Sequence, residues 1–425
     1  MVELNFSHGD EVRFRLAKEE LDAVVLESSE KDIVLVKLSS GYNMGIPKEN
    51  ILFARKIPRK RIVEEKKEFA LPKKEGLGSI GIIATGGTIA SRLDYKTGGV
   101  KPLSSIEDFA KNYPEIFEIA NVKKIEIPFL VLSESMSYEH WIKIAEKVKE
   151  MLDDNDIKGV IVTHGTDTLH YTATALSFFL RNLGKPVVLT YSQRSIDRAS
   201  SDAHLNLLSA VKMALSDCAE VMIVGHANSS DDYCFALRGT KAKKMHSSRR
   251  DAFKSINAEP IAKISENVEF ISSYNKRDNS KRVELDTNFT DKVALIKYYP
   301  GQNPEILDYY ALKYKGIVVE AAGLGHVAAS DSLYNNWIPV LKKHIRNGLV
   351  VCMTSQTIYG RVDPFVYSNG RDLQEAGVIF LEDMLSETAL VKLGWVLGHY
   401  GWKKNVKEKM LENFAGEISE RLVLG

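Results

Sequence analysis

The stretch Ile82-Ile83-Ala84-Thr85-Gly86-Gly87-Thr88-Ile89-Ala90, IIATGGTIA in one-letter code, sets the fold expected for most of the chain. Apolar residues run directly into a turn of two threonines and two glycines, which predicts a buried strand that ends in a small-residue loop. Glycines in such a loop permit positive φ and let the backbone approach a ligand closely. The loop matches neither the GxxxxGK[ST] nor the GxGxxG phosphate-binding pattern. Taken alone, it makes Thr88 a candidate for a reactive hydroxyl.

A second stretch has the same design, with VIVTHGTDT at residues 160–168. Here too a β-branched strand ends in a small polar turn. Ligands of open α/β sheets bind beyond the carboxyl ends of the strands, so Thr166 and Asp167 are expected at the same sheet edge as Thr88. The alternative for Asp167 is a helix N-cap for the segment that follows, a role compatible with catalysis.

The rest of the central region repeats this alternation of strands and helices. Residues 138–152 carry one apolar stripe at helical spacing, and Ser137 stands at the N-cap position. Apolar strands recur on either side of this helix, at 80–85, 160–163, 186–189 and 221–224. The alternation predicts a large domain with a doubly wound parallel α/β sheet at residues 78–275.

The two ends of the chain predict smaller domains. Residues 1–54 alternate with period two, as in Val12, Phe14 and Leu16, which favours a small all-β, barrel-like domain. A smaller C-terminal α/β domain is expected at 290–425, ending in helices near 386–398 and 404–421. Residues 55–77 are rich in Lys and Arg and read as a linker, either solvated or in contact with a phosphate backbone or partner.

Composition limits the function classes. The 425 residues are 44% hydrophobic and 27% charged with a formal net charge of +1, an ordinary globular balance without a global field toward nucleic acid or membrane. Three cysteines argue against a disulfide framework and for a reducing compartment. Without a signal-peptide pattern or an apolar run of about 20 residues, a cytoplasmic protein is expected. No CxxC pair or HExxH element suggests a metal site.

A threonine nucleophile needs a neighbouring base, because an unassisted hydroxyl reacts poorly. The stretch RGTKAKKMHSSRRDAF at residues 238–253 offers Lys241, Lys243 and Lys244. A run of like charges is commonly a solvated face, which is the alternative for each of these lysines.

These segments carry a family resemblance. IIATGGTIAS, VTHGTDTLHYTA and RGTKAKKMHSSRRDAFKSIN, with their spacing, resemble the signature segments of the bacterial-type L-asparaginase family over residues 78–425. The added N-terminal domain and the phrases MHSSRRDAF and YSNGRDLQEAGVI are more similar to the archaeal tRNA-dependent amidotransferases of that family. The resemblance implies an asparaginase-like fold.

The resemblance also implies site residues. The family lysine stands nine residues before the phenylalanine that matches Phe253, so it falls on Lys244 and not on Lys241. Glu134 stands where many relatives have glutamine. The implied catalytic residues are Thr88, Thr166, Asp167 and Lys244, and the implied substrate-binding residues are Tyr95 on a mobile loop, Ser133, Glu134, Gly87 and Gly165.

The function implied by the resemblance is that of a glutaminase subunit in a tRNA-dependent amidotransferase. Thr88 attacks the glutamine carboxamide, and the released ammonia passes to a partner subunit that converts Glu-tRNA(Gln) to Gln-tRNA(Gln). The partner uses ATP and Mg²⁺ and makes most tRNA contacts, whereas this chain binds no cofactor. A homodimer within a heterotetramer is expected, with no membrane contact.

Two alternatives stay open. One is a free-standing cytoplasmic L-asparaginase with an accessory β domain, because a pocket discriminates one methylene by only ~1–3 kcal/mol. The other is an inactive RNA-binding or scaffold protein on the same fold. The extra segment at residues 1–75 favours the amidotransferase subunit, since a free-standing hydrolase needs no such domain.

Overall fold

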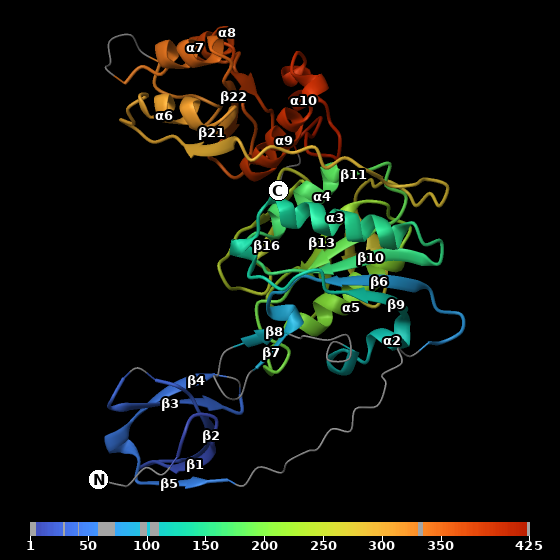
Figure 1. The fold of residues 1–425 in the computed structure, drawn as a ribbon, viewed down its shortest axis with the longest axis vertical. Coiled ribbons are helices and arrows are strands. Elements are labelled where there is room, and N and C mark those ends of the chain that lie inside the picture. The colour runs from blue at the N-terminus through green and yellow to red at the C-terminus, as the bar shows by residue number, and fades with distance from the viewer. Residues whose placement is uncertain are drawn as a thin grey trace.

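The computed structural model describes residues 6–28, 30–40, 42–57, 73–93, 100–102, 110–329 and 335–422. Figure 1 shows a small β domain at one end of the long axis, the large α/β domain in the middle and the C-terminal α/β domain at the other end. The predicted fold class is confirmed.

The N-terminal domain is one antiparallel sheet in the order β4-β3-β2-β1-β5. Its period-two pattern arises because alternate side chains, such as Val12 and Phe14, are fully buried in the domain core. The domain meets the large domain where the Tyr42 ring lies 5.5 Å from the guanidinium carbon of Arg198. The strands are β1 (Glu11–Arg15), β2 (Glu20–Val25), β3 (Ile33–Leu38), β4 (Asn43–Pro47) and β5 (Phe53–Lys56).

The large sheet is mixed, in the order β18-β17-β14-β13-β12-β10-β6-β9. The predicted parallel pairing holds from β9 to β13, whereas the last three strands are antiparallel. The connection after β13 is too short for the crossover that a parallel strand needs. The strands are β6 (Ser79–Ala84), β9 (Asn121–Glu126), β10 (Ile157–Thr163), β12 (Val187–Thr190), β13 (Val221–His226), β14 (Cys234–Arg238), β17 (Ala262–Ile264) and β18 (Val268–Phe270).

Helices cover both faces of this sheet, so its central strands are buried on both sides. Ile83 and Val162 pack into one hydrophobic cluster with α3 (Tyr138–Leu152) and α4 (Leu169–Phe179). Ile82, Ile161 and Val188 pack into the other, which includes α2 (Ile116–Ile119) and α5 (Ala203–Leu215). Burial on both faces explains the continuous apolar runs in the sequence.

Helix α3 has the predicted bounds and begins after Ser137. The Ser137 backbone N–H donates to His140 Nδ1 at 3.1 Å, which satisfies a donor at the helix start. Short paired strands complete the large domain: β7 (Ser91–Leu93) with β8 (Val100–Pro102), β11 (Leu180–Arg181) with β19 (Glu284–Leu285), and β15 (Ala242–Lys244) with β16 (Phe253–Ser255).

The C-terminal domain has a parallel sheet in the order β20-β21-β22-β23. Its last helix ends at Leu411 and not near 421 as predicted, because Gly416 has φ +74 and the buried Glu417 accepts backbone N–H groups in a turn. The elements are β20 (Val293–Lys297), α6 (Ile306–Lys313), β21 (Gly316–Ala321), α7 (Ile338–Arg346), β22 (Val350–Ser355), α8 (Ser368–Glu375), β23 (Ile379–Phe380), α9 (Ser386–Gly398) and α10 (Val406–Leu411).

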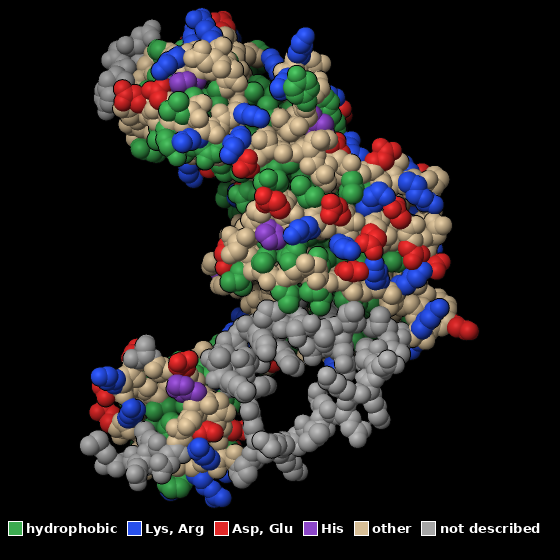
Figure 2. Space-filling view, viewed as in Figure 1, with side chains coloured by type: hydrophobic (Ala, Val, Ile, Leu, Met, Phe, Trp, Pro, Cys, Tyr) green, Lys and Arg blue, Asp and Glu red, His purple; other side chains and the backbone are tan. Residues whose placement is uncertain are grey.

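The surface and the cysteines agree with the composition. On the face shown in Figure 2, basic and acidic side chains are interspersed over the large domain. Cys218, Cys234 and Cys352 are free and buried, and burial raises the pKa of each thiol to about 12. They are therefore poor candidates for catalysis. Across the described residues, no helix is both long and apolar enough to cross a bilayer.

Candidate active site

The two predicted turns lie beside one another at the carboxyl edge of the large sheet. The turn after β6 and the turn after β10 are adjacent because their strands pair in parallel. The Thr85 hydroxyl and its backbone N–H both approach the Thr163 carbonyl, at 2.9 and 3.2 Å. Gly86 and Gly87 have φ of +121 and +80, a region that L side chains enter only with strain. The TGGT turn therefore needs its glycines.

A third turn, the 3-10 segment Ser133–Ser135, packs on the first two. A Cβ on Gly87 would lie 2.5 Å from the Gly165 backbone nitrogen. A Cβ on Gly165 would lie 2.8 Å from Ser133 Oγ. The three turns are thus in close contact, and neither glycine has room for a side chain.

Replacing Gly87 with alanine is expected to lower both activity and stability, because a Cβ overlaps backbone atoms that cannot move away. The expected loss exceeds ~1 kcal/mol in the free energy of unfolding. Gly301→Ala is the matched control, because Gly301 has the same φ of +80 with nothing within 4 Å of its Cβ position. Urea unfolding and amidase assays compare the two variants. Equal behaviour would show that the close packing of the turns is unimportant.

One cavity of about 360 Å³ lies among these turns. Ser133 is a buried residue of its lining, and the Ser133 Oγ accepts the Asp167 backbone N–H at 3.2 Å. Glu134 is an exposed residue of the lining. The residues predicted from the sequence that line this cavity are Gly87, Thr88, Ser133, Glu134, Gly165, Thr166 and Asp167. The remaining substrate residue of the prediction, Tyr95, lies outside the described residues.

Lys244 reaches the same wall from a distant part of the chain. Its Nζ donates to Thr166 Oγ1 at 2.8 Å and to Asp167 Oδ1 at 2.6 Å, and its side chain is only 11% exposed. The Asp167 side chain is 61% exposed, so this pair contributes modestly to stability. Two hydroxyls, an amine and a carboxylate thus meet at one edge of a single sheet.

Lys241 and Lys243 also have ion-pair partners inside the protein. The alternative that the three lysines form a solvated surface is therefore wrong for all three. Lys241 is fully buried and pairs with Asp383 at 2.6 Å, and burial lowers its pKa while Asp383 opposes that shift. Lys243 is mostly buried and pairs with Glu387. The sequence alone did not show these partners, which come from the C-terminal domain.

The N-cap alternative for Asp167 is likewise wrong. Helix α4 has Thr168 as its N-cap residue, and the Thr168 hydroxyl donates to the Ser133 carbonyl at 2.6 Å. The Asp167 carboxylate instead accepts from Lys244. This leaves the carboxylate directed at the lysine and not at the start of the helix.

His164 supports the second turn and was not singled out from the sequence. It is completely buried, and its Nδ1–H donates to the Gly165 carbonyl at 2.7 Å while Nε2 accepts the Thr172 hydroxyl at 2.8 Å. Burial lowers the pKa of His164 to about 4, so the ring is neutral at pH 7. Burial also lowers the pKa of His170 to about 4.

Stability is expected to fall as the pH drops from 6.5 toward 4. In this window the unfolded chain protonates both buried histidines and the folded chain does not, so the stability present above pH 6.5 is progressively lost. Each contributes up to about 3 kcal/mol. Urea unfolding at about pH 7, 5.5 and 4.5 measures this slope. His170→Phe should flatten it, and the exposed control His204→Gln should not; an unchanged slope in His170→Phe contradicts the assignment.

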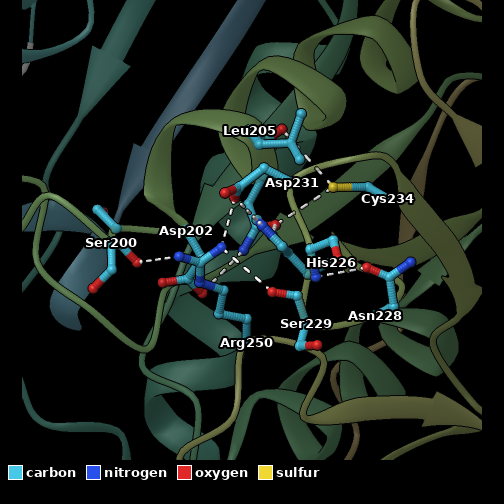
Figure 3. A network of polar contacts seen from close by, with 12 residues as sticks. Ser200, Asp202, Leu205, His226, Asn228, Ser229, Asp231, Cys234 and Arg250 are labelled. Atoms are coloured by element: carbon cyan, nitrogen blue, oxygen red, sulfur yellow. Dashed lines mark hydrogen bonds and ion pairs between the residues drawn. The ribbon is translucent and has the colours of Figure 1, made fainter.

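The loop between β15 and β16 is held to the carboxyl end of β13 by the network in Figure 3. The buried His226 lies between Asn206 Oδ1 at 2.5 Å and Asp231 Oδ1 at 3.0 Å. Arg250 donates to Asp231 at 2.7 Å and to the Ser200 carbonyl at 2.9 Å. The basic run after Lys244 thus anchors the loop. In the part of the chain that is described, no group of three His, Cys, Asp or Glu side chains is placed to hold a metal ion.

Family sequence models match three segments of the chain. Residues 6–56 match the GatD N-terminal domain, residues 79–276 match Asparaginase, N-terminal, and residues 292–410 match the Glutaminase/Asparaginase C-terminal domain. The second and third matches together span more than half of the chain.

Two curated relatives that cover nearly the whole chain carry the same name. The D subunit of glutamyl-tRNA(Gln) amidotransferase from Pyrococcus abyssi is 50% identical, with 99% of this chain and 96% of that protein covered. The protein of the same name from Methanococcus maripaludis is 43% identical, with 98% and 99% covered. Among solved structures, the thermostable L-asparaginase from Thermococcus kodakarensis is 33% identical with a TM-score of 0.72, covering 80% of this chain and 99% of that one. L-asparaginase I from Vibrio cholerae is 28% identical with a TM-score of 0.68, covering 81% and 100%.

Proposed function

The chain belongs to the asparaginase family, in the branch of the glutamyl-tRNA(Gln) amidotransferase D subunits, and on this premise we propose that it releases ammonia from glutamine. As a subunit it acts with a partner chain. In the proposal the partner activates the glutamate carried by Glu-tRNA(Gln) with ATP and Mg²⁺, and the ammonia converts it to Gln-tRNA(Gln). The chain itself contributes amino-acid side chains and backbone N–H groups and no cofactor.

The observation that carries the proposal is the position of Lys244. Its amine contacts both the Thr166 hydroxyl and the Asp167 carboxylate, which line one cavity with Thr88. A hydroxyl nucleophile is activated by a neighbouring base that a third group orients. Thr88 then serves as the nucleophile, and Thr166, Lys244 and Asp167 form the proton relay.

The proposed reaction proceeds in two steps. Thr88 Oγ forms a bond to the side-chain carboxamide carbon of glutamine, and its proton passes into the relay of Thr166 and Lys244. The C–N bond then breaks, the leaving amide nitrogen takes the proton and departs as ammonia, and a glutamyl ester stays on Thr88. Water hydrolyses this ester to release glutamate and restore the hydroxyl.

In the proposal, the glycine-containing turns and their neighbours bind the substrate and stabilise the charge that develops on it. Backbone N–H groups of the turns at Gly87 and Gly165 are suited to stabilise the oxyanion that develops on the carboxamide oxygen. In the proposal the buried Ser133 contacts the substrate α-carboxylate, and the exposed Glu134 faces the α-ammonium. The family resemblance assigns to Tyr95, which lies outside the described residues, the role of excluding water from the bound substrate.

One observation favours a second candidate, a free-standing L-asparaginase. The two solved L-asparaginases match 80% and 81% of this chain, so the large and C-terminal domains alone build the asparaginase fold. The cavity does not decide between the two substrates, because one methylene changes binding by only ~1–3 kcal/mol. The N-terminal domain is the feature that favours the amidotransferase subunit.

Ammonia release from glutamine and from asparagine separates these functions. It is measured for the full chain alone, and again with its co-purified partner and glutamylated tRNA. Partner-dependent release from glutamine is expected. Strong asparaginase activity of the isolated chain would favour the free-standing enzyme, and no amidase activity under any condition would favour the RNA-binding or scaffold alternative. Light scattering of the complex tests the proposed homodimer within a heterotetramer.

A further inference from the structure

The strand that carries Lys244 presents its lysines to two different parts of the molecule. Lys241 immediately precedes β15, and its carbonyl accepts the Ile256 N–H at 2.9 Å, so extended pairing continues to that residue. Successive side chains of a strand point to opposite faces. Lys241 and Lys243 therefore share one face, and Lys244 lies on the other, toward Thr166.

The face with Lys241 and Lys243 is attached to the C-terminal domain. Lys241 pairs with Asp383 at 2.6 Å and Lys243 pairs with Glu387, four residues further along at the start of α9. We call these two ion pairs the lysine clamp. The backbone beside it is also fixed, because the Thr388 hydroxyl donates to the Thr240 carbonyl at 2.9 Å.

Both carboxylates of the clamp are shielded from water. Asp383 is fully buried, and its second oxygen accepts the Ser419 N–H at 2.9 Å. Burial alone would raise the pKa of Glu387, but the adjacent Lys243 ammonium more than offsets this and the pKa is lowered. Buried ion pairs add little net stability, yet removing one partner is costly, because the other charge stays buried without compensation.

We propose that Glu387, by holding Lys243, is a positioning residue that keeps Lys244 against Thr166 and Asp167. The inference rests on the function proposed above for Lys244. It means that the C-terminal domain, which supplies none of the residues assigned to the chemistry, sets the geometry of the amine. Within the described residues, neither Lys243 nor Glu387 lines the substrate cavity.

The geometry sets the size of the expected effect. Lys244 Nζ lies 2.8 Å from Thr166 Oγ1 and 2.6 Å from Asp167 Oδ1, and a displacement of about 1 Å would take both contacts beyond hydrogen-bond distance. Misplacement of that size lowers a rate by up to ~100-fold. Because Glu387 lies outside the cavity, the loss should fall on kcat and leave KM for glutamine within about threefold.

Four variants of the full chain, assayed in its complex with the partner subunit, test the proposal. Glu387→Gln removes the charge. Lys243→Met with Glu387→Leu replaces the pair by apolar side chains of similar size, which is expected to preserve folding. Lys243→Glu with Glu387→Lys restores an ion pair in the opposite sense. Glu150→Gln is the matched control, because Glu150 forms exposed ion pairs with Lys124 and Lys147.

The first two variants should lose ~10- to 100-fold in kcat with KM unchanged, the exchanged pair should return to within about threefold of wild type, and Glu150→Gln should match wild type. If the kcat of Lys243→Met with Glu387→Leu is within threefold of wild type, the proposal is overturned. It is also overturned if the kcat of Lys243→Glu with Glu387→Lys is no higher than that of Glu387→Gln. If Lys244→Ala is inactive in the same assay, either of these outcomes rejects only the positioning role of Glu387 and not the proposed function. If Lys244→Ala is fully active, the proposed function fails first.

Discussion

Replacing Thr88 with alanine is expected to lower ammonia release from glutamine by more than ~1000-fold and to leave the free energy of unfolding within about 1 kcal/mol of wild type. The reason is that Thr88 lines the same cavity as Thr166, the hydrogen-bond partner of Lys244, and would supply the oxygen of the proposed ester. Removing the hydroxyl and the methyl group from a side chain at the cavity wall disturbs little packing. Steady-state ammonia assays and urea unfolding measure the two quantities on the same preparation.

Thr88→Ser is the control, because it keeps the hydroxyl and should retain measurable turnover. Turnover of Thr88→Ala within tenfold of wild type would mean that Thr88 is not the nucleophile, since tenfold corresponds to only about 1.4 kcal/mol of activation free energy. Thr166 would then be the next candidate, because its hydroxyl also lines the cavity.

Replacing Lys244 and Lys241 with alanine should separate catalysis from stability. Lys244→Ala is expected to lose more than ~100-fold in kcat with little change in unfolding, because it removes the relay amine from a partly solvated pair. Lys241→Ala should instead cost ~3–5 kcal/mol of stability, because it leaves the Asp383 carboxylate buried without its partner.

Turnover and urea unfolding of both variants, measured below the unfolding transition of Lys241→Ala, make the comparison. The wild type and Glu150→Gln serve as references. Equal losses of turnover in Lys244→Ala and Lys241→Ala, with equal stabilities, would mean that the assignment of the relay amine to Lys244 is incorrect.

That Thr88 and Thr166 line one cavity could be predicted from the sequence for a simple physical reason. Both residues follow β-branched strands, and the carboxyl ends of parallel strands meet at one sheet edge. The start of α3 after Ser137 was equally predictable, because a short polar side chain before an amphipathic stripe is a local signal. Features that depend on strand ends and caps thus followed from short stretches of sequence.

The environment of the lysines depended on contacts between distant residues. The partners Asp383 and Glu387 lie 142 and 144 positions after Lys241 and Lys243, so no local pattern pairs them. Side chains alternate between the two faces of a strand, which places Lys244 opposite Lys243. This can be used only when residues 242–244 are known to form a strand. A basic run alone does not distinguish a clamped strand from a solvated face.

The differences between the predicted and the observed fold also arise from features that a local sequence pattern does not show. The short connection after β13 forces an antiparallel return, which apolar periodicity does not reveal. The helix predicted to reach 421 stops at Leu411, where the ion pair of Glu417 with Lys392 holds a buried turn in place of helix. Asp167 suited an N-cap by position, but the amine of Lys244 offers its carboxylate a charged partner.

The most direct test of the proposed chemistry is to trap the covalent intermediate. The full chain with its partner is treated with a glutamine analogue that carries an electrophilic diazoketone in place of the carboxamide, and the labelled peptide is identified by mass spectrometry. A label on Thr88 that is lost in Thr88→Ala and forms much more slowly in Lys244→Ala is predicted. A label on Thr166 or on a cysteine, or labelling at Thr88 that is equally fast without Lys244, would contradict the proposal.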